Sequence, residues 1–168
     1  MNFKSLNALS PDEALKEFLK CCGSVNWAKG MVQLRQYASS IDGLARLGKS
    51  FWWVLQPADW LEAFRSHPKI GEKKAAEVVP TQAKEWSGQE QAGVCEANQD
   101  TVDALAQLNR EYEQKFGFIF IVCATGKSAA EMLELLRERL NNEPDAELRI
   151  AAAEQAKITE IRLKKLVH

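Results

Sequence analysis

Apolar side chains recur three and four positions apart along most of the chain, which is the spacing of a helix with one buried face. The clearest case is the stretch from about Asn98 to Lys115, where the recurring apolar residues are Val102, Leu105, Leu108 and Tyr112. Similar patterns predict helices over about 26–38, 41–55, 128–140 and 145–166. The sequence therefore predicts an all-α fold.

Two stretches carry the residues that commonly begin a helix. Ser10 can act as an N-cap, Pro11 suits the first turn, and Glu13 completes a capping box with the serine. The stretch "QPADWLEAFRS" repeats the signal with Pro57 and Asp59. At 168 residues the chain is long enough for one core and short for two, so we expect a single domain over residues 1–168 built as a compact bundle of about seven to nine helices.

One apolar run, "FGFIFIVCATG" at residues 116–126, departs from the helical pattern. Its β-branched and aromatic residues between glycines are typical of a buried strand. No second run of this kind exists to pair with it, and an unpaired strand would leave backbone groups unsatisfied. We therefore expect a buried extended or partly helical connector whose backbone groups bind something other than a sheet.

Composition and charge narrow the classes of function. The 22 basic and 23 acidic residues give a net charge of −1, so no long-range field favours nucleic acid or an anionic membrane. The N-terminal residues lack the apolar core of a secretory signal, and no stretch is apolar enough to span a bilayer. Four cysteines with one adjacent pair do not suggest a disulfide framework, which favours a reducing cytoplasm. Two histidines and no C-x-x-C predict no metal site.

An arginine lies on the apolar face of the last predicted helix. Arg162 is four residues from both Ile158 and Leu166. A buried guanidinium requires an anionic partner. Two alternatives stay open: the side chain extends along the edge of the core to a surface carboxylate, or it binds a carboxylate-like ligand.

The stretch "WSGQEQAGV" gathers Ser87, Glu90 and Gln91 within one helical turn. Ser87 and Glu90 match the capping-box pattern, which would explain both residues without any function. That structural explanation leaves Gln91 unexplained, and it allows a second use for the Glu90 carboxylate if the helix end faces a cavity.

The stretch "SHPKIGEKKA" contains His67, and Pro68 favours an extended backbone at this histidine. A lone loop histidine is usually solvent-exposed, yet its titration near neutrality suits a group that transfers protons. No G-x-S-x-G, P-loop or G-x-G-x-x-G motif competes with it.

Four motifs in register resemble one known family: "SHPKIGEKK", "WSGQEQAGV", "LNREYEQKFGFIFIVCATGKS" and "ELRIAAAEQAKITEIRLKKL". In order and spacing they are similar to the decarboxylases of 2-oxo-4-hydroxy-4-carboxy-5-ureidoimidazoline (OHCU), which act in uric acid degradation. The resemblance covers nearly the whole chain. It implies an all-helical fold, a homodimer, and decarboxylation of OHCU to (S)-allantoin without a metal or organic cofactor.

The resemblance also implies the residues of the site. His67, Glu90 and Arg162 match the catalytic positions. The substrate-binding positions match Pro68, Ser87, Gln91, Phe120, Ile121, Val122, Cys123 and Ala124. The last five would line the pocket with their backbone, which would account for a strand-like run without a partner strand.

The substrate chemistry is consistent with these residues, because the ring C=N of OHCU can accept the electrons released as CO2 leaves. On this interpretation His67 transfers the proton, and Glu90 either orients the imidazole or binds N–H groups of the substrate. Arg162 binds a substrate oxygen, while Gln91 and Ser87 fix its orientation.

Two other functions remain open. The first is a non-catalytic helical module that binds a partner through Trp52, Trp53 and Trp60. It predicts that Arg162 pairs with a protein carboxylate and that His67 faces solvent. The second is a related cofactor-free reaction on another ureide or purine-derived acid.

Overall fold

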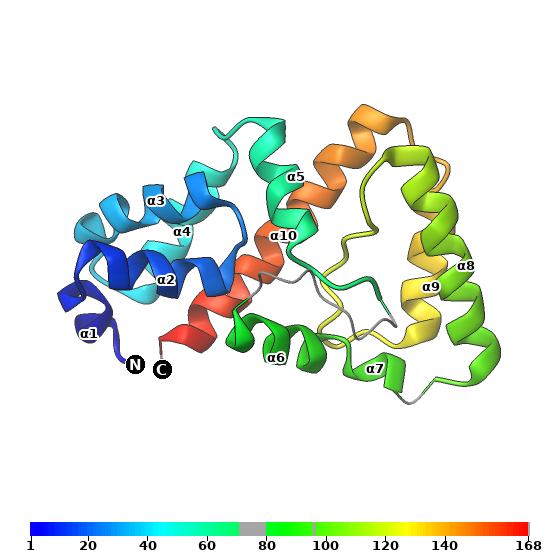
Figure 1. Ribbon diagram of the computed structural model, residues 1–168, viewed down its shortest axis with the longest axis horizontal. Coiled ribbons are helices and arrows are strands. Elements are labelled where there is room, and N and C mark those ends of the chain that lie inside the picture. Colours follow the sequence, from blue (N-terminus) through cyan, green and yellow to red (C-terminus); the bar gives the residue numbers. More distant parts are fainter. Residues whose placement is uncertain (71–79, 96, 168) are drawn as a thin grey trace. The chain divides into compact units, whose positions relative to one another are not determined.

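The computed structural model describes residues 1–70, 80–95 and 97–167, and these residues are largely helical (Figure 1). They form α1 (Phe3–Ala8), α2 (Pro11–Cys21), α3 (Val25–Leu34), the 3-10 helix η1 (Arg35–Tyr37), α4 (Ile41–Trp52), α5 (Pro57–Arg65), α6 (Thr81–Glu90), α7 (Ala92–Cys95), α8 (Gln99–Phe116), α9 (Ala129–Arg139) and α10 (Pro144–Leu166).

Eight of these α-helices have nine residues or more, which agrees with the seven to nine expected. No strand occurs among the described residues, so the predicted all-α class is confirmed. None of the helices found in these residues is both long enough and apolar enough to cross a membrane. Of the stretch "SHPKIGEKKA", residues 71–75 lie outside the described part of the chain.

Local capping signals fix several helix ends. The Ser10 side chain accepts a hydrogen bond from the Glu13 N–H, and Glu13 Oε2 accepts one from the Ser10 N–H at 2.9 Å. Ser128 and Glu131 form the same box at the start of α9. Helix α8 ends at Phe116, and its C-cap Gly117 has a φ of 77°, in the left-handed region that glycine adopts without strain. These ends follow from the sequence itself.

The chain divides into two compact units. We call residues 1–63 with 156–168 the N-terminal unit, and residues 64–155 the central unit. Since the boundaries fall inside α5 and α10, each of these helices contributes residues to both units.

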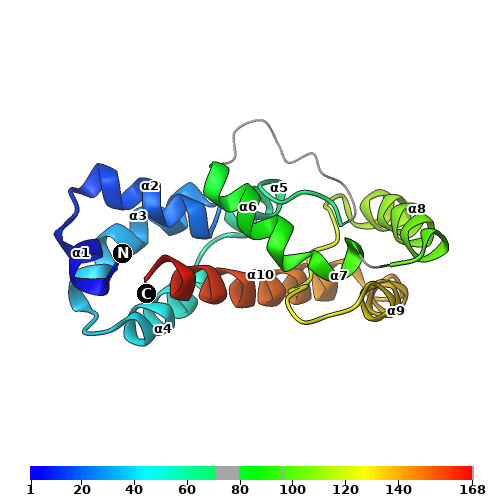
Figure 2. The ribbon, with the colours of Figure 1, turned by 90° about the horizontal axis from the view of Figure 1, so that it is seen from below.

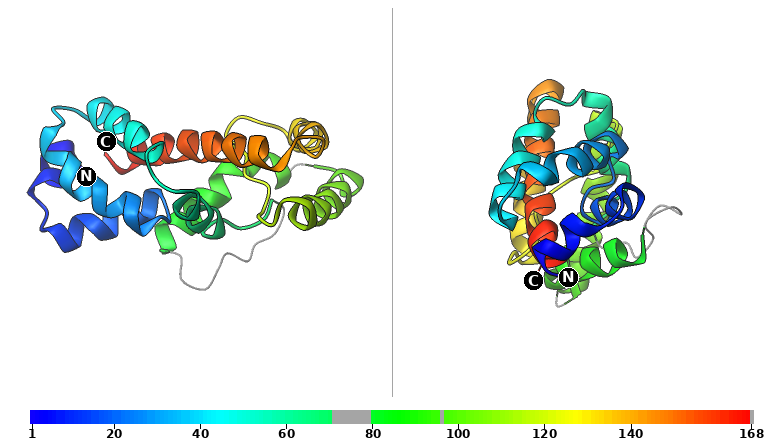
Figure 3. Two further views of the ribbon diagram at one scale, coloured as in Figure 1. Left: turned by 90° about the horizontal axis from the view of Figure 1, so that it is seen from above. Right: turned by 90° about the vertical axis from the view of Figure 1, so that its left-hand side faces the viewer.

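In the N-terminal unit, α3 packs against both α2 and α4 (Figures 1 and 2). The buried Trp27 of α3 meets the ring of Phe18 edge-on, with centroids 6.2 Å apart, and its Nε1–H donates to the carbonyl of Gly48 at 3.1 Å. The two chain ends lie together (Figure 3), where the amino group of Met1 donates to the carbonyl of Leu166 at 3.3 Å. The final turns of α10 thus belong to the fold of the first four helices.

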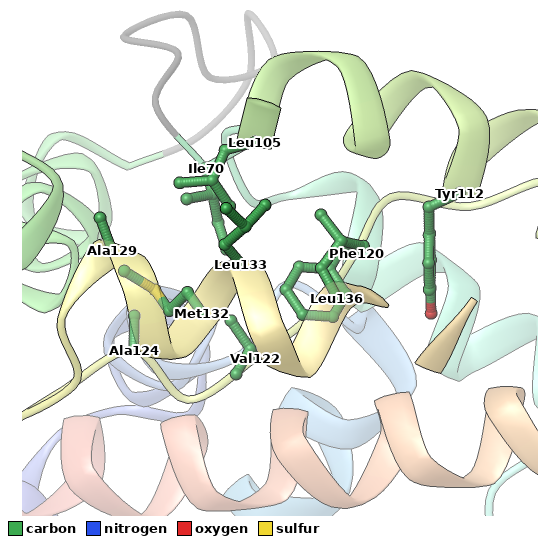
Figure 4. Packing of buried hydrophobic residues seen from close by; sticks show 10 residues of the cluster. All are labelled: Ile70, Leu105, Tyr112, Phe120, Val122, Ala124, Ala129, Met132, Leu133 and Leu136. Carbon is green, nitrogen blue, oxygen red and sulfur yellow. The ribbon is translucent and has the colours of Figure 1, made fainter. Parts of the chain in front are cut away.

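In the central unit, α8 and α9 pack side by side and are joined by the connector at residues 117–128 (Figure 1). Their facing sides form an apolar core with the connector (Figure 4). The buried members of this core are Ile70, Leu105, Tyr112, Phe120, Val122, Ala124, Ala129, Met132, Leu133 and Leu136. The connector is therefore part of the core instead of a surface loop.

A charged network is buried at the edge of this core. The fully buried Glu147 accepts hydrogen bonds from Arg139 Nε at 2.7 Å, from Asn142 Nδ2 at 2.8 Å, and from the Tyr112 hydroxyl. Burial raises the pKa of Tyr112, so this hydroxyl keeps its proton and acts as a donor. The carboxylate is thus stabilised by one cation and two neutral donors.

Replacing Glu147 should destabilise the protein strongly. Glu147→Leu leaves the Arg139 guanidinium buried without its counter-charge, and we expect a loss of about 3 to 5 kcal/mol in the free energy of unfolding. Urea denaturation measures this. The control is Glu134→Gln, which removes an exposed ion pair with Arg137 on α9 and should cost no more than about 1 kcal/mol. Equal losses in the two variants would contradict a stabilising role for the network.

Candidate active site

His67 lies two residues beyond the end of α5, and its backbone N–H still bonds to the carbonyl of Phe64 at 3.1 Å. The side chain is half-buried, and its Nε2 is 2.8 Å from Oε1 of Gln155 on α10. The expectation for an ordinary loop histidine, exposure to solvent, therefore does not hold here. The structure fixes the ring with a partner 88 positions away in the chain.

Ser87 and Glu90 occupy the last turn of α6, and both are buried. The capping-box explanation of these residues was wrong, because α6 begins at Thr81 with Pro80 at the N-cap position. A serine that caps a helix lies just before the first helical residue, whereas Ser87 lies within α6, after its first turn. Gln91 is the C-cap, and its backbone N–H donates to the carbonyl of Ser87 at 3.1 Å. The Glu90 side chain is thus not used to begin a helix.

The segment Phe120–Ala124 is buried throughout and forms neither helix nor strand. Its backbone groups bind charged side chains. The carbonyl of Ile121 accepts from Arg139 Nη1 at 2.7 Å, and the Cys123 N–H donates to Glu154 Oε2 at 2.7 Å. The carbonyl of Cys123 accepts from Lys127 Nζ at 2.8 Å. The prediction of a buried connector bound by something other than a sheet is confirmed.

A cavity of about 670 Å³ opens within the central unit between α6, α7, the start of α8 and the residues that lead into α9. Glu90 and Ala124 are the candidate site residues in its lining, and Lys127 contributes a cation. Gly93 of α7 is required for close packing there, since a Cβ at this position would lie 2.3 Å from the Lys127 carbonyl oxygen. Glu90, buried at the end of α6, therefore lines a space large enough for a small ligand.

The thiol of Cys123 is not a nucleophile in this environment. Burial raises its pKa above the ordinary value of 9.0, and the nearby Glu154 carboxylate acts in the same direction, although Lys127 opposes them. The thiol is therefore protonated at neutral pH. The backbone of Cys123, which binds Glu154 and Lys127, is the part of the residue that organises the segment.

Arg162 belongs to the N-terminal unit, where it lies on α10 with an exposure of 2%. The guanidinium is therefore buried, as its place on the apolar face of the helix predicted. Its positive charge acts on the buried thiols of Cys21 and Cys22, lowering their pKa values in part, although burial raises them more. The assignment of Arg162 to the binding of a ligand stays a prediction.

The sequence did not reveal the side chains that hold the candidate residues in place. Gln155 binds His67, while Glu154 and Lys127 bind the backbone of Cys123. The sequence did contain a signal, because Glu154 and Gln155 stand in "AAAEQAKI", next to alanines that are buried in the structure. Polar residues at buried helical positions require partners.

Comparisons with known proteins agree on one family. The family model for OHCU decarboxylase matches residues 7–164. The chain is 38% identical over 151 residues to the uric acid degradation bifunctional protein TTL of Arabidopsis thaliana, covering 89% of this chain and 46% of that protein. It therefore spans less than half of the Arabidopsis protein. It is 31% identical over 170 residues to the 2-oxo-4-hydroxy-4-carboxy-5-ureidoimidazoline decarboxylase of Amia calva, covering 99% of this chain and 95% of that protein.

Solved structures show the same likeness. A crystal structure of OHCU decarboxylase in the presence of (S)-allantoin shares 38% identity and a TM-score of 0.73, and the match covers 89% of this chain and 96% of the other. A crystal structure of (S)-allantoin synthase matches with a TM-score of 0.75 at 18% identity, which shows a shared fold alone.

Removing the acceptor for the Cys123 N–H should destabilise the connector. In Glu154→Leu the buried N–H of Cys123 loses its partner, and we expect a loss of about 1 to 3 kcal/mol in the free energy of unfolding. Glu154→Gln keeps an acceptor oxygen and should lose less, and Glu111→Gln on the exposed side of α8 is the control. Urea denaturation of all three proteins checks the order. A Leu variant as stable as the control would show that this hydrogen bond contributes nothing.

Proposed function

This chain belongs to the OHCU decarboxylase family, and on that premise we propose that it is a carboxy-lyase that converts OHCU to (S)-allantoin in uric acid degradation. The observation that carries the proposal is the extent of the family match, residues 7–164, which includes every candidate site residue. The second activity implied by the name of the longer Arabidopsis protein is not part of the proposal. The same match runs through both units, which supports one functional domain.

The bond between the carboxylate and the ring carbon that bears the hydroxyl breaks, CO2 leaves, and the electron pair of that bond moves into the adjacent C=N of the ring. A proton then adds to one face of the neighbouring ring carbon, which carries the ureido group. The hydroxyl becomes the carbonyl of allantoin as its proton moves to the ring nitrogen, so that one proton is consumed for each CO2 released. The substrate supplies its own electron sink, and the protein need only orient the carboxylate and deliver the proton.

His67 is the proton-transfer group in this proposal. Support comes from its half-buried position and from the hydrogen bond between its Nε2 and Gln155, which holds the ring in one orientation. A general acid must be oriented toward the atom that it protonates. The non-catalytic module predicted a solvent-facing histidine, and this geometry argues against it.

Glu90, Gln91 and Ser87 bind the substrate in this proposal, as do Pro68 and the backbone of Phe120–Ala124. Glu90 lines a cavity from the end of α6, which suits an acceptor for the ureido and ring N–H groups. Of its two suggested roles, binding these groups is favoured over orienting the imidazole, because Gln155 already bonds to the ring. Arg162 retains its proposed role of binding a substrate oxygen.

The partner-binding alternative has little support from the tryptophans. Trp52 and Trp60 are buried in the N-terminal unit, where the Nε1–H of Trp60 donates to the carbonyl of Trp52 at 3.0 Å. Of the three suggested anchors, only Trp53 is exposed, at 39%. The other alternative is a reaction on a different ureide. Incubating the protein with candidate ureides and measuring CO2 release distinguishes this alternative from decarboxylation of OHCU.

The test is the activity of His67→Gln with freshly generated OHCU. Loss of one oriented general acid should reduce the rate of (S)-allantoin formation by about 100- to 10,000-fold, measured by circular dichroism. His168→Gln replaces the other histidine and should keep the wild-type rate. A His67→Gln protein that formed (S)-allantoin as fast as the wild type would refute the assignment, and a wild type inactive on OHCU would refute the function.

We also propose a homodimer, as the resemblance implies, and a cytoplasmic location. Support for the location comes from Cys21, Cys22 and Cys123, which are free thiols. Support for the dimer comes from Trp53 and Val54, two large apolar residues that are adjacent in the sequence and exposed. Light scattering after size exclusion should give twice the 18.9 kDa mass of the chain, and a mass of one chain would contradict the dimer.

A further inference from the structure

We propose that Gln155 is a positioning residue that holds His67 in the tautomer with hydrogen on Nε2, and so assigns the proton transfer to Nδ1. The inference rests on the proposed role of His67 and extends it, because it names the nitrogen that reacts and the side chain that selects it.

The geometry provides the first step. The Nε2 of His67 and the Oε1 of Gln155 are 2.8 Å apart, a distance that fits a direct hydrogen bond. Gln155 is fully buried on α10, with an exposure of 0%. A buried carboxamide oxygen has little access to water, so its bond to the imidazole is costly to lose.

The chemistry of the two groups decides which of them donates. A carboxamide oxygen can only accept a hydrogen bond, so the Nε2 of His67 must carry the hydrogen. A neutral imidazole has one protonated nitrogen, and hence the other, Nδ1, holds the lone pair. Proton loss and gain by His67 then take place at Nδ1.

The neighbouring contacts hold Gln155 in place. Glu154, the preceding residue on α10, accepts the Cys123 N–H at 2.7 Å, and the carbonyl of Cys123 accepts from Lys127 at 2.8 Å. His67 is fixed from its own side by the bond between its N–H and the carbonyl of Phe64. One turn of α10 thus binds both the histidine and the connector that the family resemblance places at the substrate.

The first test reads the tautomer directly. The chain has two histidines, so the ¹⁵N-labelled His168→Gln protein has His67 as its sole imidazole. Two-bond ¹H–¹⁵N correlation spectra at a pH where the ring is neutral should show a protonated Nε2 and an unprotonated Nδ1. The opposite pattern, with hydrogen on Nδ1, would overturn the proposal, and so would an even mixture of the two.

The second test removes the acceptor. Gln155→Leu should change the spectrum toward a mixture of tautomers and lower kcat with little change in KM. We expect a loss of about 10- to 100-fold in kcat, by analogy with the loss of a side chain that orients a metal-bound histidine. Gln155→Glu keeps an acceptor oxygen and should retain the Nε2–H tautomer. Gln107→Leu, which removes an exposed glutamine from α8, is the matched control and should change neither quantity.

The outcomes separate this inference from the proposed function. The spectra require no turnover, so a protein inactive on OHCU with hydrogen on Nε2 would reject the function and keep the role of Gln155. An active Gln155→Leu enzyme with wild-type kcat and an unchanged tautomer would reject the role of Gln155 and keep the function. If Gln155→Leu does not fold by circular dichroism, the wild-type spectrum and Gln155→Glu still decide the question.

Discussion

The buried backbone of Phe120–Ala124 imposes the constraint on which the central unit depends. A segment without a helical or strand partner must satisfy its amides and carbonyls in another way, because each unpaired buried group costs about 1 to 3 kcal/mol. Arg139, Lys127 and Glu154 provide these partners from α9, from the loop before it and from α10. Charged side chains make strong hydrogen bonds to a backbone, but their burial in turn needs compensation.

That compensation shapes the surroundings of the segment. Glu147 balances the charge of Arg139 and also binds Tyr112 and Asn142. The guanidinium of Arg139 lies over the ring of Phe120, with its Cζ 4.5 Å from the ring centroid. Lys127 and Glu154 carry opposite charges and bind the carbonyl and the N–H of the same residue, Cys123. Fixing one extended segment therefore fixes the positions of α9 and the first half of α10. Because Gln155 follows Glu154 on α10, the hydrogen bond of Glu154 to Cys123 also positions the Gln155 side chain.

Local signals in the sequence predicted the helices well, because capping and amphipathic spacing act over a few residues. Ser10 and Ser128 begin α2 and α9 through contacts with residues three positions later. The same rule failed at Ser87, where an identical pattern falls inside a helix that starts at Thr81. Contacts such as that of His67 with Gln155 join residues 88 positions apart, and no local pattern encodes such a pair. The unpaired apolar run was the exception, since its lack of a partner strand is itself visible in the sequence.

A glutamine suits a proton-transferring histidine better than a carboxylate would. A carboxylate at Nε2 would favour the imidazolium and hold the ring protonated, which hinders a group that must release its proton. The carboxamide of Gln155 is neutral, so it can select the tautomer and the orientation without adding a full charge beside the ring. The carboxylate of Glu90 then remains at the end of α6, where it lines the cavity and can bind donors on a substrate. The proposed roles thus divide two tasks between Gln155 and Glu90, orientation of the imidazole and recognition of the ligand.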